Sequence, residues 1–187
     1  MAKLSPAELK QRLAQDLPGA LVEPHAPANG NGNGATEPAT KPALRHGQSA
    51  PVNLLATEDA LVRPDALPQV ALYVRDTLGY ALLSNITAVD YLKEQLIEVV
   101  YHFFHLDGGP ELVVKTRVPR DAAQLPSITP FWPGADFQER EAYDLYGVVF
   151  SGHPDLRRIY MWDEFEGFPM RKDFPKQGDK YFEADGE

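Results

Sequence analysis

The sequence predicts one α+β domain, in which helices pack on a mostly antiparallel sheet, followed by an extended C-terminal arm. Two stretches in the first half have the capping residues and apolar spacing of amphipathic helices, and three consecutive stretches after residue 79 are rich in strand-forming residues. After residue 150, aromatic, basic and proline residues follow without a regular period. At 187 residues, the chain is long enough for one substantial core.

The composition excludes several classes of protein. No apolar run approaches the roughly 18 residues that cross a bilayer, and the N-terminus lacks the apolar segment of a secretory signal. The absence of cysteine excludes disulfides, thiolate-held iron–sulfur clusters, cysteine zinc sites and a cysteine nucleophile. A formal net charge of -9 argues against a nucleic-acid partner, so we expect a protein or a small molecule.

The N-terminal part, residues 1 to 23, is expected to hold a helix and a possible short strand at Leu21 and Val22. Ser5 is a suitable N-cap for the helix, Pro6 suits its first position, and Glu8 completes a capping box. Residues 24 to 51 are rich in Pro, Gly and Asn and almost lack large apolar side chains. They are predicted to form a disordered insertion.

Residues 52 to 150 are predicted to form the α+β core. Its expected elements are an extended segment at 52 to 62, a helix at 66 to 78, strands at 80 to 91, 97 to 106 and 112 to 118, a hairpin turn at 107 to 110 and an acidic helix at 137 to 146. One short helical turn is expected at 127 to 132, broken by Pro133 and Gly134.

The acidic helix carries the carboxylates that decide between a binding surface and an active site. Asp136 and Glu139 are predicted to form a capping box, and Gly147 to follow the last turn. Helical spacing places Glu139 inside the apolar arc, whereas Arg140 and Asp144 share an outer edge as an i, i+4 pair. A carboxylate on an apolar face is either buried with a partner or covered by another chain.

The candidate partners of these acids within the chain are Arg157, Arg158, Arg171 and Lys172. A solvated helix face is the alternative. Glu139 and Glu141 point roughly 160° apart at about 100° per residue, so they cannot jointly flank one substrate bond. Glu141 with Asp144 is too small a set to indicate a cation site.

The histidines favour structural roles over metal binding or catalysis. His102 and His105 are three residues apart on a predicted strand, which places them on opposite faces. His153 lies at a turn between the acidic helix and the basic end, where a structural histidine is favoured over a general base. The chain contains no nucleophile motif, P-loop or dinucleotide-binding motif.

The C-terminal arm, residues 151 to 187, combines arginines with large aromatic side chains and is extended by its prolines. Tyr160, Trp162 and Phe165 are candidate interface aromatics, because Tyr, Trp and Arg anchor protein interfaces. The arm is interpreted either as a docking segment or as a tail wrapped on its own domain, and the two interpretations are compatible.

Two segments, EREAYDLYGVVFSGHPDLRRI and EGFPMRKDFP, resemble the signature of the C, or 30-kDa-type, subunit of respiratory complex I, the NADH:quinone oxidoreductase. The residues on the family pattern are Glu139, Arg140, Glu141, Asp144, Gly147, Phe150, Gly152, His153, Pro154, Leu156, Arg157, Arg158, Gly167, Pro169, Arg171, Lys172, Asp173 and Pro175. The insertion at 24 to 51 departs from this pattern.

The resemblance implies a peripheral-arm subunit that packs on subunits D and B near the quinone-reducing end, at the cytoplasmic face of the cell membrane. Its membrane association would be through the complex only, and it would support assembly and electron transfer from NADH to quinone. FMN, iron–sulfur clusters and quinone would belong to the assembled complex, with no cofactor, metal or catalytic centre in this chain. The candidate interface or buried ion-pair residues are Glu139, Arg140, Glu141, Asp144, His153, Arg157, Arg158, Arg171, Lys172 and Asp173.

Two alternatives remain open at this point. The chain is also suited to an equivalent subunit of a membrane-bound hydrogenase or of a ferredoxin- or deazaflavin-type dehydrogenase. A free-standing enzyme would use Glu139, Glu141, Asp144 or His153, but the divergent directions of Glu139 and Glu141 on a helix disfavour it.

Overall fold

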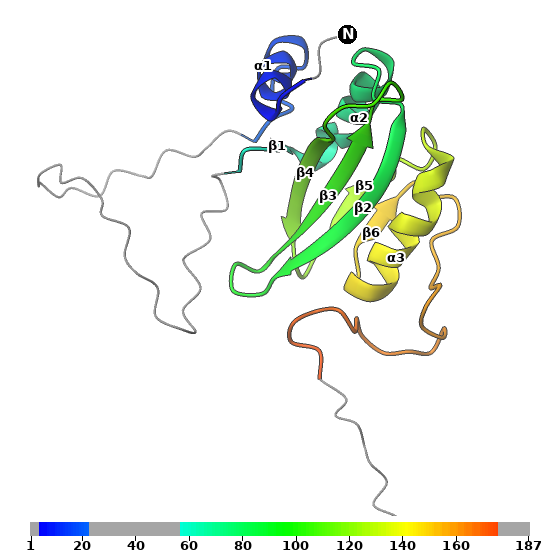
Figure 1. The fold of residues 1–187 in the computed structure, drawn as a ribbon. Helices are drawn as coiled ribbons and strands as arrows, with labels where there is room; N and C mark the ends of the chain where they lie inside the picture. The colour runs from blue at the N-terminus through cyan, green and yellow to red at the C-terminus, as the bar shows by residue number, and fades with distance from the viewer. Residues whose placement is uncertain (1–3, 23–56, 176–187) are drawn as a thin grey trace, which may run out of the picture.

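The computed structural model describes residues 4–22 and 57–175. The predicted insertion at 24 to 51 and the end of the C-terminal arm, residues 176 to 187, lie outside these ranges. Figure 1 shows a twisted sheet with helices packed around it, which confirms the predicted α+β class. After the last helix, the chain continues as an irregular segment below the sheet.

The first helix, α1, spans Pro6–Asp16 and begins with the predicted capping box. The Ser5 hydroxyl accepts the Glu8 N–H at 3.3 Å, and the Ser5 N–H donates to the Glu8 carboxylate at 2.7 Å. Leu9 and Leu13 are completely buried, so the predicted apolar stripe holds the helix on the domain. The possible strand at Leu21 is a single bridge to Val62.

The main sheet contains four strands in the order β1-β4-β3-β2. They are β1 (Ala60–Val62), β2 (Leu82–Tyr91), β3 (Leu96–Phe104) and β4 (Leu112–Pro119). β2 with β3 and β3 with β4 are antiparallel, as predicted, whereas β1 runs parallel to β4. The sheet is therefore mixed, but mostly antiparallel.

The core lies against one face of this sheet. The alternating residues of β3, Ile97, Val99, Tyr101 and Phe103, are completely buried. The helix α2 (Leu67–Asp76), which follows a 3-10 turn, η1 (Pro64–Ala66), buries the side that the sequence pattern predicts. The period of two along the strands and the helical stripe of α2 therefore meet in one core.

The segment between β4 and the last helix differs from the prediction. No helix forms at 127 to 132, where the Ile128 carbonyl accepts the N–H groups of Phe131 and Trp132 in a turn. Pro133 begins a 3-10 turn, η2 (Pro133–Ala135), that leads into α3 (Asp136–Tyr146). A proline is compatible with the first position of a helix, and here it starts one instead of ending one.

A second, two-stranded parallel sheet joins β5 (Gln124–Pro126) to β6 (Val149–Ser151) on either side of α3. Strands of three residues are too short to produce a detectable alternation in the sequence. Their pairing brings the two ends of the α3 region together.

The start of α3 also corrects the prediction. Ala135 is the N-cap, no side chain caps the helix, and the proposed capping box of Asp136 and Glu139 is wrong. Glu139 turns into the core instead. Gly147 ends the helix as predicted, with φ +75°, in the left-handed region that favours glycine.

Replacing Gly147 with alanine tests how the end of α3 supports the arm. An added Cβ would lie 2.5 Å from the Phe168 ring and would have to adopt a positive φ. We expect a loss of about 1–2 kcal/mol or more in the free energy of unfolding, measured with urea. Gly134→Ala is the control, because its Cβ meets no atom within 4 Å; equal stability of both variants would contradict the prediction.

Candidate functional site

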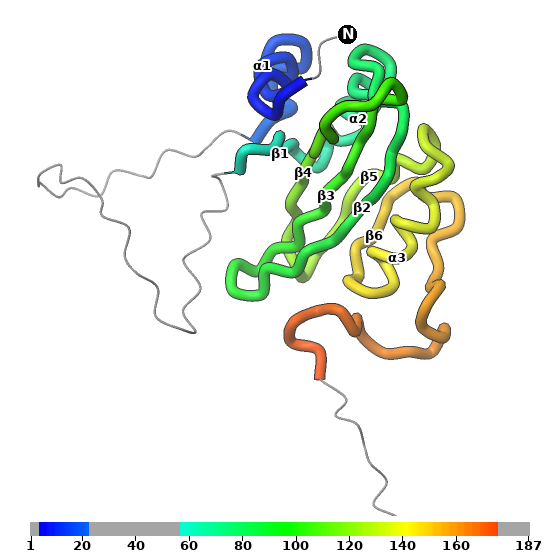
Figure 2. The backbone as a smooth tube through the Cα atoms, viewed as in Figure 1, coloured from blue at the N-terminus to red at the C-terminus, as the bar shows by residue number. Residues whose placement is uncertain are grey.

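The C-terminal arm and α3 form the candidate functional region. Figure 2 shows the chain leaving β6, passing along α3 and curling below the main sheet. In residues 152 to 175 no helix or strand is formed, so the backbone groups of the arm depend on side chains for hydrogen bonds. Two clusters of buried charge supply them.

The first cluster surrounds the carboxylate of Asp144, which is completely buried on α3. It accepts the successive N–H groups of Ile159, Tyr160 and Met161 at 2.9, 2.7 and 3.0 Å. The Arg158 guanidinium donates to it at 2.6 Å. Burial alone would raise the pKa of Asp144, but the N–H groups and the guanidinium outweigh it and lower the pKa.

Arg158 extends this cluster to the next turn of the arm. The same guanidinium donates to the carbonyls of Phe165 and Gly167, both at 3.0 Å. It also lies 5.6 and 5.7 Å from the ring centroids of Phe165 and Phe168. One arginine therefore joins α3 to two separate parts of the arm.

The second cluster fastens the far end of the described arm to the sheet. Arg120, just after β4, donates to the buried Asp90 of β2 at 2.7 Å and also binds Asp173. The Lys172 N–H donates to the same Asp90 carboxylate at 2.8 Å. Burial would raise the pKa of Asp90, but Arg120 and the Lys172 N–H outweigh burial and lower it.

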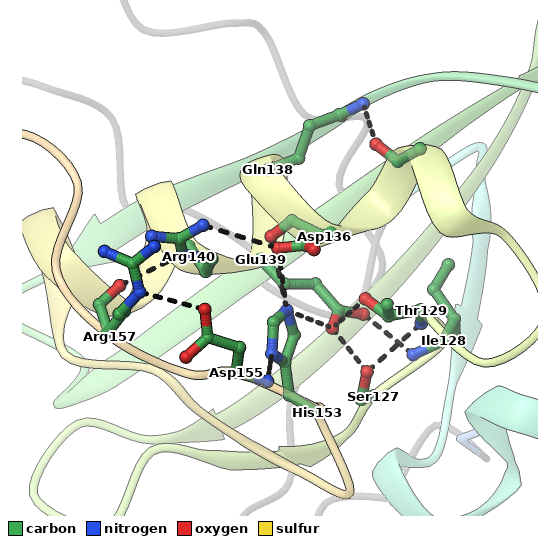
Figure 3. A network of polar contacts seen from close by, with 11 residues as sticks. Ser127, Ile128, Thr129, Asp136, Gln138, Glu139, Arg140, His153, Asp155 and Arg157 are labelled. Atoms are coloured by element: carbon green, nitrogen blue, oxygen red, sulfur yellow. Dashed lines mark hydrogen bonds and ion pairs between the residues drawn. The ribbon is translucent and has the colours of Figure 1, made fainter.

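A third cluster lies on the other side of α3, around Glu139 (Figure 3). Its carboxylate is completely buried and accepts the Ser127 and Thr129 hydroxyls and the Ile128 N–H. Burial raises the pKa of Glu139 despite these three donors. The predicted arginine or lysine partner is wrong for this residue, because neutral donors from the turn after β5 satisfy it.

His153 borders this cluster and has a completely buried side chain. Its Nδ1 accepts the Asp155 N–H at 3.0 Å, which places the ring proton of the neutral form on Nε2. Nε2 lies 3.3 Å from the Asp136 carbonyl oxygen and 3.9 Å from Glu139 Oε2. These contacts hold the turn after β6 against α3, which is a structural arrangement.

The remaining candidates are distributed differently from the prediction. Arg140 and Asp144 do not pair on an outer edge; Arg140 is buried and approaches Asp136 and the Arg157 carbonyl at 3.8 and 3.3 Å. The arm covers the side of α3 that helical spacing alone assigned to solvent. Arg157 pairs at the surface with Asp155, and Glu141 is exposed.

Arg171 and the aromatic candidates complete the arm. Arg171 donates to the Tyr146 carbonyl at 2.7 Å, which closes the end of α3. Tyr160 and Trp162 are 59% and 63% exposed, and Phe165 is half-buried against the Trp162 ring. The described arm therefore directs its charges inward and part of its aromatic surface outward.

Within residues 4–22 and 57–175, no group of three or more histidine, aspartate or glutamate side chains is placed to hold a metal ion. Among the helices of these same ranges, none is long and apolar enough to cross a membrane. The ordered features of this region are polar fasteners and an aromatic surface.

A comparison with known families decides the classification. The family model described as the 30 Kd subunit of respiratory-chain NADH dehydrogenase matches residues 60–180, which include the main sheet, α3 and the described arm. The chain belongs to this family. The resemblance to the C, or 30-kDa-type, subunit of complex I is thereby confirmed.

Individual relatives of this 30 Kd subunit are similar over most of the same length. The C subunit of the NADH-quinone oxidoreductase of Moorella thermoacetica is 46% identical over 119 residues, covering 63% of this chain and 80% of the relative. The relative from Rhizobium etli, an NADH-quinone oxidoreductase subunit designated C 2, is 43% identical over 122 residues, covering 64% of this chain and 65% of the relative. The match thus spans a little under two thirds of the Rhizobium protein.

A solved structure is similar as well. It is a chain of the membrane-bound sulfane sulfur reductase, an archaeal respiratory membrane complex, with 34% sequence identity and a TM-score of 0.58. The match covers 63% of this chain and 71% of that chain. Members of respiratory membrane complexes are therefore found among both the sequence and the structural relatives.

Substitutions at Glu139 test the third cluster. Glu139→Ala leaves the buried Ile128 N–H without an acceptor and opens a cavity, so we expect a loss of about 3 kcal/mol in unfolding free energy. Glu139→Gln retains one acceptor oxygen and should lose less than half of that. Glu141→Ala, at the exposed position two residues away, should stay within about 0.5 kcal/mol. Urea unfolding that ranks the three variants otherwise would contradict the described network.

The lowered pKa of Asp144 predicts an acid-dependent loss of stability. The ionised form is favoured in the folded protein, so its contribution is present above the ordinary pKa of about 4 and disappears as the pH falls through the lowered value. Asp144→Asn should therefore be less stable at pH 7 and show a flatter decline below about pH 4 than the parent. Urea unfolding from pH 3 to 7, with Asp121→Asn at an exposed site as control, measures the difference.

Proposed function

We propose that this 30 Kd family member is a docking subunit of the peripheral arm of an ion-translocating NADH:quinone oxidoreductase, seated on subunits D and B near the quinone-reducing end. In this proposal it supports assembly and the passage of electrons from NADH to quinone. The C-terminal arm carries the proposal, because its buried ion pairs hold it in place while Tyr160, Trp162 and Met170 stay 59%, 63% and 53% exposed.

Exposed aromatic side chains on a fixed backbone suit a protein interface. Aromatic anchors contribute most when they are held in place before binding, since less conformational entropy is then lost. The Asp144 and Arg120 clusters restrict the arm at both of its ends. A partner that covers the aromatic surface would therefore bind a prepared site, which suits a permanent subunit contact.

The division of labour in the complex follows from this role. FMN, iron–sulfur clusters and quinone would be held by other subunits, and this chain would reach the cytoplasmic face of the membrane through them. Relatives named as subunits of NADH-quinone oxidoreductases support this assignment. The carboxylates of α3 serve to fasten the chain and take no part in bond breaking.

The free-standing enzyme is poorly supported by the geometry. Glu139 is enclosed and already accepts three hydrogen bonds, whereas Glu141 is exposed on another side of α3. Two carboxylates in such positions cannot act on one substrate bond.

A second candidate is the equivalent subunit of a related membrane complex. The similarity to a chain of the archaeal sulfane sulfur reductase complex favours it specifically. Membrane-bound hydrogenases and ferredoxin- or deazaflavin-type dehydrogenases are further members of this candidate class. The proteins that accompany subunits D and B distinguish the candidates: NADH-binding subunits indicate complex I itself.

Affinity purification of the tagged full chain from gently solubilised membranes tests the proposal. We expect subunits D and B to be recovered, and Trp162→Ala to lower their recovery without changing the stability of the isolated chain. Arg158→Ala leaves Asp144 buried and unpaired, so we expect a loss of about 3–5 kcal/mol in stability together with lower recovery. Arg63→Ala, which breaks a surface pair with Asp65, is the matched control. A monomeric parent chain would contradict the docking role.

A further inference from the structure

A groove of about 570 Å³ opens in the C-terminal arm. Trp162, Phe165 and Phe174 line it together with Pro169, and Arg171 and Lys172 border it. The groove is formed by residues that are adjacent only because the arm folds back on itself. It therefore depends on the two charge clusters described above.

The aromatic side of the groove is an ordered set of rings. The Trp162 and Phe165 rings meet edge to face with centroids 4.9 Å apart, and the Phe165 and Phe174 rings are stacked at 5.8 Å. Trp162 nevertheless remains 63% exposed. A surface that is packed on one side and open on the other offers apolar area to a binding segment.

The basic side of the groove contains two cations whose side chains pair with no carboxylate among residues 4–22 and 57–175. The Arg171 guanidinium donates to the Tyr146 carbonyl, and the Lys172 ammonium lies 5.9 Å from the Tyr91 ring centroid. Burial and the nearby Arg120 lower the pKa of Arg171. An added carboxylate would counter both effects.

The surrounding charge selects the kind of ligand. Residues 160 to 175 contain four acids, Asp163, Glu164, Glu166 and Asp173, against the two bases Arg171 and Lys172. A nucleic acid or an anionic membrane presents many phosphates at once and would meet the four acids as well. A single carboxylate placed beside Lys172 would not.

We propose that this groove binds a segment of a neighbouring subunit that places one aspartate or glutamate beside Lys172 and apolar side chains against Trp162 and Phe174. The inference rests on the proposed docking function and adds the chemistry of the partner segment to it. The Lys172 backbone is held by Asp90, so its side chain starts from a fixed position. The contact thus combines an apolar anchor with one charge pair that sets the register.

A zero-length carbodiimide cross-link tests the charge pair directly, because this reagent joins an amine only to a carboxylate in contact with it. The complex purified through the tagged full chain is treated with the carbodiimide, digested and analysed by mass spectrometry. We expect Lys172 to be joined to an aspartate or glutamate of one of the two neighbours, subunits D and B. Lys172→Arg keeps the charge but lacks the amine, so the complex should form without this cross-link.

Charge reversal supplies the second measurement. Lys172→Glu should weaken association about tenfold or more, whereas Lys93→Glu, at an exposed position of the β2–β3 turn, should leave it unchanged. Reversal of the cross-linked partner acid to lysine should restore binding to Lys172→Glu.

The remaining outcomes overturn the inference in distinguishable ways. A complex that forms without a Lys172 cross-link and tolerates Lys172→Glu refutes the groove contact but leaves the docking function intact. A cross-link from Lys172 to Glu183, Asp185 or Glu187 assigns the groove to the end of this same chain. Binding of the chain to phosphatidylglycerol vesicles that Lys172→Glu abolishes assigns it to lipid. Failure to recover any complex refutes the docking function itself.

Discussion

A carboxylate buried in a protein interior must find partners, and Asp144 finds them in the segment that follows it. Its two oxygens bind one guanidinium and three consecutive backbone N–H groups, which are otherwise without hydrogen bonds in an irregular chain. The direction of the whole arm follows from this contact. The groove and the exposed aromatic side chains exist because Asp144 holds the backbone from which they project.

The two buried acids of α3 show how the same side-chain chemistry serves different purposes. Glu139 is surrounded by hydroxyls and one N–H, and burial keeps its pKa raised. Asp144 faces an arginine, and its pKa is lowered. Glu139 connects α3 to the turn after β5, within the domain. Asp144 connects α3 to the arm, which is the part of the chain available to a neighbour.

The sequence predicts the elements whose patterns are long enough to show a period, namely α1, α2, α3 and the strands β2 to β4. It misses β5 and β6, since three residues carry no period, and it misplaces Arg140 and Asp144 because the covering arm has no periodicity of its own. Asp90 and Arg120 were detectable. Both continue the buried alternation of their strands, so an acid and a base stood at core positions.

The Asp90 cluster links residues that are distant in the sequence: its carboxylate and the Lys172 N–H are separated by 82 positions. Contacts of such separation form late, after the intervening sheet has closed. The C-terminal arm is then the last part of the chain to reach its place. A chain with an unfinished sheet has no groove to present, so subunits that have not folded are left out of the complex without any additional means of inspection.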